Sequence, residues 1–194
     1  MATTIFQNVI QKAGTAPQNS IEARNWLRQK AAEVRNVDTR ATITQGPFLT
    51  NRIIPGNMYL FAYDPKTKED LPYYDRFPLV FPFRRVPGGF YGINMHYLPP
   101  LLRAKLMDAL YDTVNNDKMD ETTRLRINYR ILQSAAKFRF FEPCVKHYLN
   151  NHVKTRFLRV DPTQWDVALF LPLERFAKAT KSRIYADTKK KIYQ

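Results

Sequence analysis

Residues 55–100 constrain the fold more than any other part of this chain, because they combine apolar runs with frequent turn signals. The stretch holds 8 of the 13 prolines and 4 of the 6 glycines. Three apolar runs lie between the turns, at residues 58–63, 78–83 and 90–97. Short aromatic runs bounded by proline and glycine are typical of β-strands. We therefore predict a small β module here, with helical periodicity on both sides of it.

The three runs predict a small SH3-like or open β-barrel over about residues 41–98. The first run is apolar at nearly every position, so both faces of that strand are expected to be covered. The second contains Pro78 and Pro82, which cannot donate a ladder hydrogen bond, so it lies at a sheet edge or across a bend. The expected barrel core consists of Tyr59, Phe61, Leu79, Phe81 and Ile93.

Helical patterns flank this module, and the fold class is therefore α+β, with an N-terminal helix and a helical C-terminal half. Ser20 is placed to cap a helix ending near residue 34, and Asp120 to cap another in the C-terminal half. A short helix is expected to open at Pro143 and run through residue 149. Short strands are expected at residues 41–43 and 155–160.

The chain is long enough for one domain with extended ends. Residues 1–19 are polar and broken by Gly14 and Pro17, which predicts an extended N-terminal arm. Residues 20–188 are expected to form a single α+β domain, and residues 189–194 a basic C-terminal tail.

The net charge of +14 is large and uneven. From residue 122 onward there are 16 basic and 5 acidic residues, so this part carries +11. Such a charge points to a polyanion, an anionic surface or an acidic protein as partner. Basic and aromatic residues alternate over 137–141, as in proteins that bind phosphates and stack bases. Docking onto acidic protein surfaces is the commoner explanation of such a pattern. The candidates for either role are Arg124, Arg126, Arg130, Lys137 and Arg139.

Catalytic and metal chemistry find little support. Cys144, His147 and His152 lack a fourth ligand and match no usual zinc spacing. A Cys144–His147 nucleophile pair would lack an orienting carboxylate. The acidic residues at 64, 69, 70 and 75 could hold a metal, but interleaved basic residues favour surface ion pairs. We expect no enzyme activity, metal or cofactor, and no membrane contact, because no apolar run is long enough to span a bilayer.

Two sequence blocks resemble a known group of proteins. The first comprises Asp64-Pro65-Lys66, Leu71-Pro72-Tyr73-Tyr74-Asp75, Pro78-Leu79-Val80 and Gly92-Ile93-Asn94-Met95-His96-Tyr97-Leu98. The second is Trp165-Asp166-Val167-Ala168-Leu169-Phe170-Leu171-Pro172, with Phe176 and Ser182. Together they resemble uncharacterised proteins of the T-even-like contractile-tailed bacteriophages, over about residues 21–191. The resemblance implies a virion or virion-assembly protein and brings no catalytic residues with it.

Three hypotheses follow. The first is a tail or baseplate adaptor that joins larger virion subunits, with Tyr73, Tyr74, Phe90 and His96 as docking residues. The second is a neck or head-completion protein that binds genome-end DNA through the basic C-terminal half. The third is a hydrolase or nuclease that uses the loop carboxylates. The first two place the protein in the virion, assembled in the host cytoplasm, with other virion proteins or DNA as partners.

Overall fold

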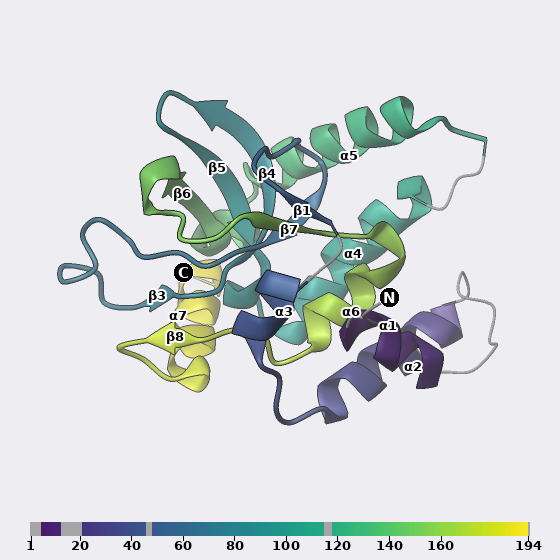
Figure 1. Cartoon of the computed structure of the whole chain (residues 1–194), viewed down its shortest axis with the longest axis horizontal. Helices are drawn as coiled ribbons and strands as arrows, with labels where there is room; N and C mark the ends of the chain where they lie inside the picture. Colours follow the sequence, from purple (N-terminus) through teal and green to yellow (C-terminus); the bar gives the residue numbers. More distant parts are fainter. Residues whose placement is uncertain (1–4, 13–20, 46–47, 115–117, 194) are drawn as a thin grey trace.

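The computed structural model describes residues 5–12, 21–45, 48–114 and 118–193, and an antiparallel six-stranded sheet lies at its centre (Figure 1). The strand order is β1-β7-β2-β4-β5-β6. Their bounds are β1 Leu49–Thr50, β2 Met58–Leu60, β4 Leu79–Val86, β5 Gly89–Asn94, β6 Val145–Leu149 and β7 Phe157–Val160. A second, two-stranded sheet pairs β3 Tyr74–Asp75 with β8 Phe176–Ala177.

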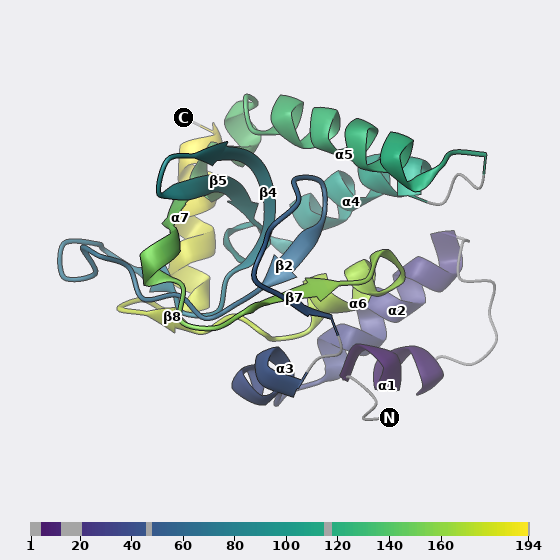
Figure 2. The ribbon, with the colours of Figure 1, turned by 45° about the horizontal axis from the view of Figure 1, so that its top comes forward.

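Helices lie on several sides of the sheet: Figure 2 shows α4 with α5, α1 with α2 and α6, and α7 apart from both sets beside β5. The α-helices are α1 Ile5–Lys12, α2 Ile21–Glu33, α3 Thr39–Gln45, α4 Pro100–Val114, α5 Glu121–Ala135, α6 Trp165–Phe170 and α7 Lys181–Tyr193. Four 3₁₀ turns connect elements: η1 Met95–Tyr97, η2 Arg139–Cys144, η3 Asn150–His152 and η4 Pro162–Gln164. Helices α4 and α5 pack together on one side of the molecule, while α2 packs against α6 on another.

The alternation of side chains in the strands produces two apolar clusters, one on each face of the sheet. In β2, Met58 and Leu60 join the main core with the helices, whereas Tyr59 faces the other way. We call the second cluster the aromatic cluster; its buried members are Ile53, Tyr59, Phe61, Tyr63, Val80, Phe90, Tyr148 and Phe157. The expectation that both faces of this strand are covered is confirmed, and the five predicted core residues are all buried.

The hairpin of β4 and β5 is built by its prolines and glycines. Gly88 adopts a φ of 75° in the turn, a conformation that favours glycine. The register shifts between Pro82 and Arg84, which marks a bulge in β4. Pro82 therefore lies at a bend of an inner strand, which is the second of the two expected locations.

Two local predictions are wrong. Residues 41–43 lie in helix α3 and not in a strand, because the Asp38 carboxylate accepts a hydrogen bond from the Ala41 backbone N–H and caps the helix. Pro143 does not open a helix that runs through residue 149. It lies inside η2, and Val145–Leu149 instead pairs with β5 as strand β6.

The chain ends are more structured than expected. Ile5–Lys12 is helical, and its spacing buries Phe6 and Val9 in the main core, so this part of residues 1–19 is not an extended arm. Residues 1–4 and 13–20 lie outside the described residues. The expected basic tail begins inside α7, which continues to Tyr193 and buries Ile192 while Lys189, Lys190 and Lys191 stay exposed.

The α+β class is confirmed, with helices toward both ends of the chain and an antiparallel sheet that does not close into a barrel. The strand expected near residues 155–160 is also confirmed, as β7. None of the helices in the described part of the chain has the length and apolar character needed to cross a membrane.

Candidate functional site

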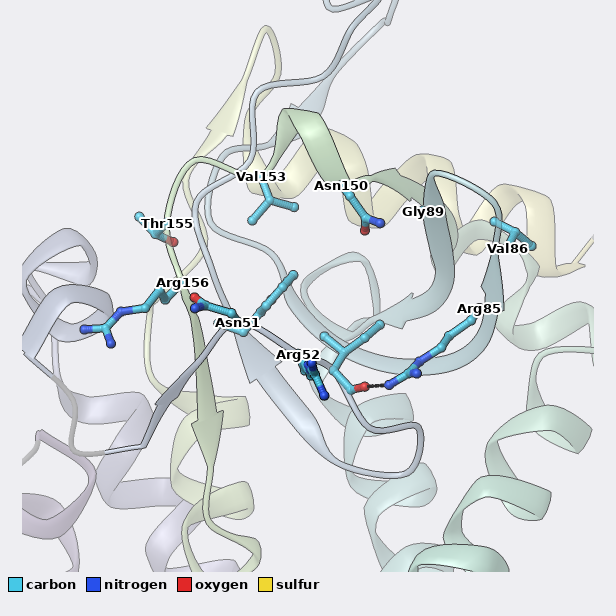
Figure 3. Close-up of a pocket in the computed structure, with 11 residues that line it drawn as sticks. Asn51, Arg52, Arg85, Val86, Gly89, Asn150, Val153, Thr155 and Arg156 are labelled. Atoms are coloured by element: carbon cyan, nitrogen blue, oxygen red, sulfur yellow. Dashed lines mark hydrogen bonds between the residues drawn. The ribbon is translucent and has the colours of Figure 1, made fainter.

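A pocket of about 590 Å³ opens where the β4–β5 hairpin, the segment after β1 and the start of β7 meet (Figure 3). We call it the arginine pocket. Pairing of Thr50 in β1 with Phe157 in β7 brings two parts of the chain about a hundred residues apart to one wall. The lining residues are Asn51, Arg52, Ile53, Arg85, Val86, Gly89, Asn150, Val153, Thr155, Arg156 and Phe157.

The pocket is strongly electropositive. None of the eleven described residues that line it is acidic, while three are arginines that are exposed to solvent. The guanidinium of Arg85 donates a hydrogen bond to the backbone carbonyl of Ile53, which fixes its direction across the pocket. Figure 3 shows Arg156 on the side opposite Arg85, with its guanidinium pointing outward. Guanidinium groups in this arrangement suit an anion with several phosphates more than a single carboxylate.

The apolar part of the pocket belongs to the aromatic cluster and is therefore held rigidly. Ile53 and Phe157 are each 9% exposed. The Phe157 ring packs edge-on against Phe61, with 5.0 Å between ring centroids. The hydroxyl of Tyr59 accepts a hydrogen bond from the Ile54 backbone N–H, which ties the segment after β1 to the sheet. The pocket therefore combines a buried apolar wall with exposed cationic groups at its rim.

A second pocket of about 480 Å³ adjoins the first, and both are lined by Thr155. We call it the side pocket. It adds Arg40, Arg76 and Lys154, all exposed, to the same basic surface. It also contains one carboxylate, Asp64, which forms an ion pair of 3.1 Å with Lys68. Lys68 also lines the side pocket and neutralises Asp64, the one carboxylate in the two linings. Apart from Lys68, the two pockets together present six cationic groups.

The basic residues predicted from the sequence lie elsewhere, on and after α5. Arg126 and Arg130 are exposed one turn apart, and Arg124 is partly exposed. Lys137 and Arg139 are exposed in the segment that follows, beside Phe138 and Phe140, which are 60% and 48% exposed. We call these five basic residues the α5 surface. The arginine pocket shares no residue with it.

Two of the four predicted docking residues are partly exposed to solvent, and the other two are buried. Tyr73 and Tyr74 are half-buried. Phe90 and His96 are fully buried, so their assignment as docking residues is wrong. Phe90 points into the aromatic cluster, because its strand is covered on both faces.

His96 belongs to a buried polar network. Its Nδ1 lies 2.7 Å from the Asp75 carboxylate, and the Asn94 side chain donates hydrogen bonds to both Asp75 and the Tyr148 hydroxyl. Burial raises the pKa of the Tyr148 hydroxyl well above its usual value. Asp75 and His96 are buried, and the network holds β3, β5 and η1 together. Asp75, Asn94 and Tyr148 also line one side of a pocket of about 360 Å³.

Glu174 joins the same region from the segment before β8. Its carboxylate pairs with Lys181 at the start of α7. Burial opposes ionisation, but His96, Arg103 and Lys181 outweigh it and lower the pKa of this carboxyl to about 2. Arg103 is itself buried and donates hydrogen bonds to the backbone carbonyls of Leu98 and Leu169.

The thiol and the carboxylates that the sequence offers for catalysis or metal binding are buried or paired with other side chains. Burial raises the pKa of the Cys144 thiol to about 12, so this thiol is protonated at neutral pH and is a poor nucleophile. Asp64 is paired with Lys68, and Asp75 is buried against His96. Among the residues that the structure describes, no group of three His, Cys, Asp or Glu side chains is placed to hold a metal ion.

Sequence reasoning missed the arginine pocket and the side pocket. Arg52, Arg85 and Arg156 stand singly or in pairs in the sequence, with nothing nearby that marks a site. Only the pairing of β1 with β7 and the folding back of the β4–β5 hairpin bring them together.

Comparison with known protein families gives a match over nearly the whole chain. The family described as "phage T4 terminal DNA protecting protein" matches residues 6–193, nearly the whole chain. No curated protein matches the chain, and no solved structure matches it. The match supports the resemblance to proteins of T4-like phages and does not extend to a tail or baseplate role.

Proposed function

The chain belongs to the family of the phage T4 terminal DNA protecting protein, and on this premise we propose that it binds the ends of linear duplex DNA and shields them. This is the second of the hypotheses drawn from the sequence. The path of the DNA, however, is proposed along the arginine pocket and the side pocket and not only along the C-terminal half.

The observation that supports the proposal most strongly is the basic surface formed by the arginine pocket and the side pocket. Six cationic groups lie around two adjoining hollows, and the lining carboxylate is neutralised. Phosphate contacts dominate the affinity of proteins for nucleic acids, and arginine is suited to bind phosphate with two parallel hydrogen bonds.

Protection is proposed to act by occupancy and not by catalysis. The carboxylates near the β3 loop are paired or enclosed, and the Cys144 thiol is buried. A bound protein that covers the terminus excludes other proteins from it without any chemical step. We place this activity in the virion and in the host cytoplasm during assembly. The proposal of a tail or baseplate adaptor has no specific observation in its favour.

The test is the salt dependence of binding to a linear duplex, measured by fluorescence anisotropy. With about six phosphate contacts, the affinity is expected to fall about 10³-fold between 50 and 200 mM salt. Absence of binding at about 50 mM salt would remove the proposal.

Two matched double variants locate the DNA path. Arg52→Ala with Arg156→Ala removes two exposed arginines from the arginine pocket, and Arg126→Ala with Arg130→Ala removes two from the α5 surface. The first pair is expected to lower the slope of log affinity against log salt by about two. The pair on the α5 surface is expected to change this slope less. A larger change with the second pair would move the DNA path to α5.

A further inference from the structure

We infer that the arginine pocket holds the terminal nucleotide of a DNA strand through its 5′-phosphate. The inference rests on the proposed binding of DNA ends and deepens it by naming the group that is recognised and the residues that recognise it.

The size of the pocket excludes a duplex and admits a nucleotide. A volume of 590 Å³ corresponds to a sphere about 10 Å across, narrower than the major groove of B-DNA alone, which is about 12 Å wide. The same volume lies within the range of about 300–1,000 Å³ that is usual for small-ligand pockets. The group that enters the pocket is therefore one unpaired nucleotide, while the duplex that carries it lies outside, across the rim.

The charges of the pocket match a phosphate at a strand end. Figure 3 shows Arg52 and Arg85 toward the same side of the pocket, and Arg85 is oriented by its hydrogen bond to the Ile53 carbonyl. A phosphodiester carries one negative charge, whereas a terminal phosphate monoester carries about −1.5 to −2 at pH 7. Two guanidinium groups near each other bind the monoester more strongly than an internal phosphodiester.

The remainder of the pocket suits a base and its sugar. Ile53, Val153 and Phe157 supply an apolar wall. The side-chain amides of Asn51 and Asn150 supply donors and acceptors for the edge of a base. Such a wall accepts any base, so the site would recognise the end of a strand irrespective of its sequence.

The pocket also explains how an end is distinguished from the middle of a duplex. An internal nucleotide must be flipped out of the stack before it can enter, at a cost of a few kcal/mol. A terminal nucleotide has a neighbour on one side only and frays more readily. Entry into the pocket therefore favours DNA with free ends.

The test compares three duplexes of equal sequence: one with 5′-phosphates, one with 5′-hydroxyls, and one closed at both ends by hairpin loops. The wild-type protein is expected to bind the phosphorylated duplex at least 10-fold more tightly than the closed one, with the hydroxyl duplex between them. The variant Asn51→Trp fills the pocket from an exposed position and leaves the charge unchanged. It is expected to reduce both ratios to near one, as is Arg52→Ala with Arg85→Ala.

Arg126→Ala with Arg130→Ala serves as the control, because it removes the same charge from the α5 surface and is expected to keep both ratios. Ratios that persist in both pocket variants would overturn the inference and leave the proposed function standing. A wild-type protein that binds all three duplexes equally would overturn both the inference and the proposed preference for ends, and absence of all binding would overturn the proposed function itself. Thermal melting of each variant confirms that it is folded.

Discussion

At the scale of single residues, some basic side chains of this protein form ion pairs with carboxylates, and others are exposed at the surface. Arg28 contacts Asp166 at 2.7 Å and Asp108 at 2.9 Å, and both arginine and Asp166 are buried. This pair joins α2 to α6, and the Arg28 guanidinium also lies over the Phe170 ring of α6. By contrast, the arginines of the arginine pocket meet no carboxylate in its lining. The buried pair therefore stabilises the fold, while the exposed groups are available for an anion.

Replacing Asp166 with alanine is expected to destabilise the protein by about 3–5 kcal/mol, because it leaves the Arg28 guanidinium buried with its main partner removed. Denaturant unfolding measures the change. Lys30→Ala is the control on the same helix: its pair with Glu33 is exposed and is expected to contribute about 1 kcal/mol or less. Equal losses in the two variants would contradict this assignment.

Glu174 predicts a pH dependence of stability. Its pKa is about 2 in the folded protein and about 4.5 when unfolded, so the folded state holds this proton less tightly. The resulting stabilisation is present above pH 4.5 and is lost as the pH falls toward 2; its full size is on the order of 3 kcal/mol. The difference in unfolding free energy between wild type and Glu174→Gln should therefore shrink over this range. A difference that is independent of pH would disprove the role.

At the scale of elements, the β4–β5 hairpin shapes both the sheet and the arginine pocket. Gly92 pairs with Pro82 beside the bulge, and a Cβ atom there would lie 2.2 Å from Val80 Cγ1. Val80 is fully buried in the aromatic cluster and cannot move aside easily. The close approach of the two strands therefore requires glycine at this position.

Gly92→Ala is expected to cost about 1–3 kcal/mol, the usual penalty for overpacking a core. Urea unfolding gives the value. Because the hairpin also lines the arginine pocket, DNA affinity of the folded variant should fall as well. A variant with the unfolding free energy of the wild type would show that β4 and β5 can move apart without destabilising the protein.

The sequence predicted those elements whose signals are local. The cap at Asp120 is one of these, since its side chain accepts a hydrogen bond from the backbone N–H of Thr123, three residues away. Residues 145–149 were misassigned as helix because their strand character depends on pairing with β5, which is distant in the chain. The arginine pocket depends on the same kind of long-range pairing. The burial of Phe90 and His96 is not visible in the sequence, because it depends on the strands and turns that cover them.

At the scale of the whole molecule, the described residues include two separate basic surfaces besides the exposed lysines of α7. One comprises the arginine pocket and the side pocket, and the other is the α5 surface with its exposed phenylalanines. A net charge of +14 repels itself, so a polyanion that covers either surface stabilises the folded protein. The melting temperature is therefore expected to rise on addition of linear duplex DNA, and to rise less at high salt.

The most direct test of end binding is protection of linear duplexes of several lengths from an exonuclease. If the protein occupies termini, the amount needed for full protection depends on the number of ends and is the same for short and long DNA at equal molar concentration. The proposed function predicts this result, with loss of protection in the Arg52→Ala, Arg156→Ala double variant. A requirement that grows in proportion to DNA length, or absence of protection at saturating protein, would contradict it.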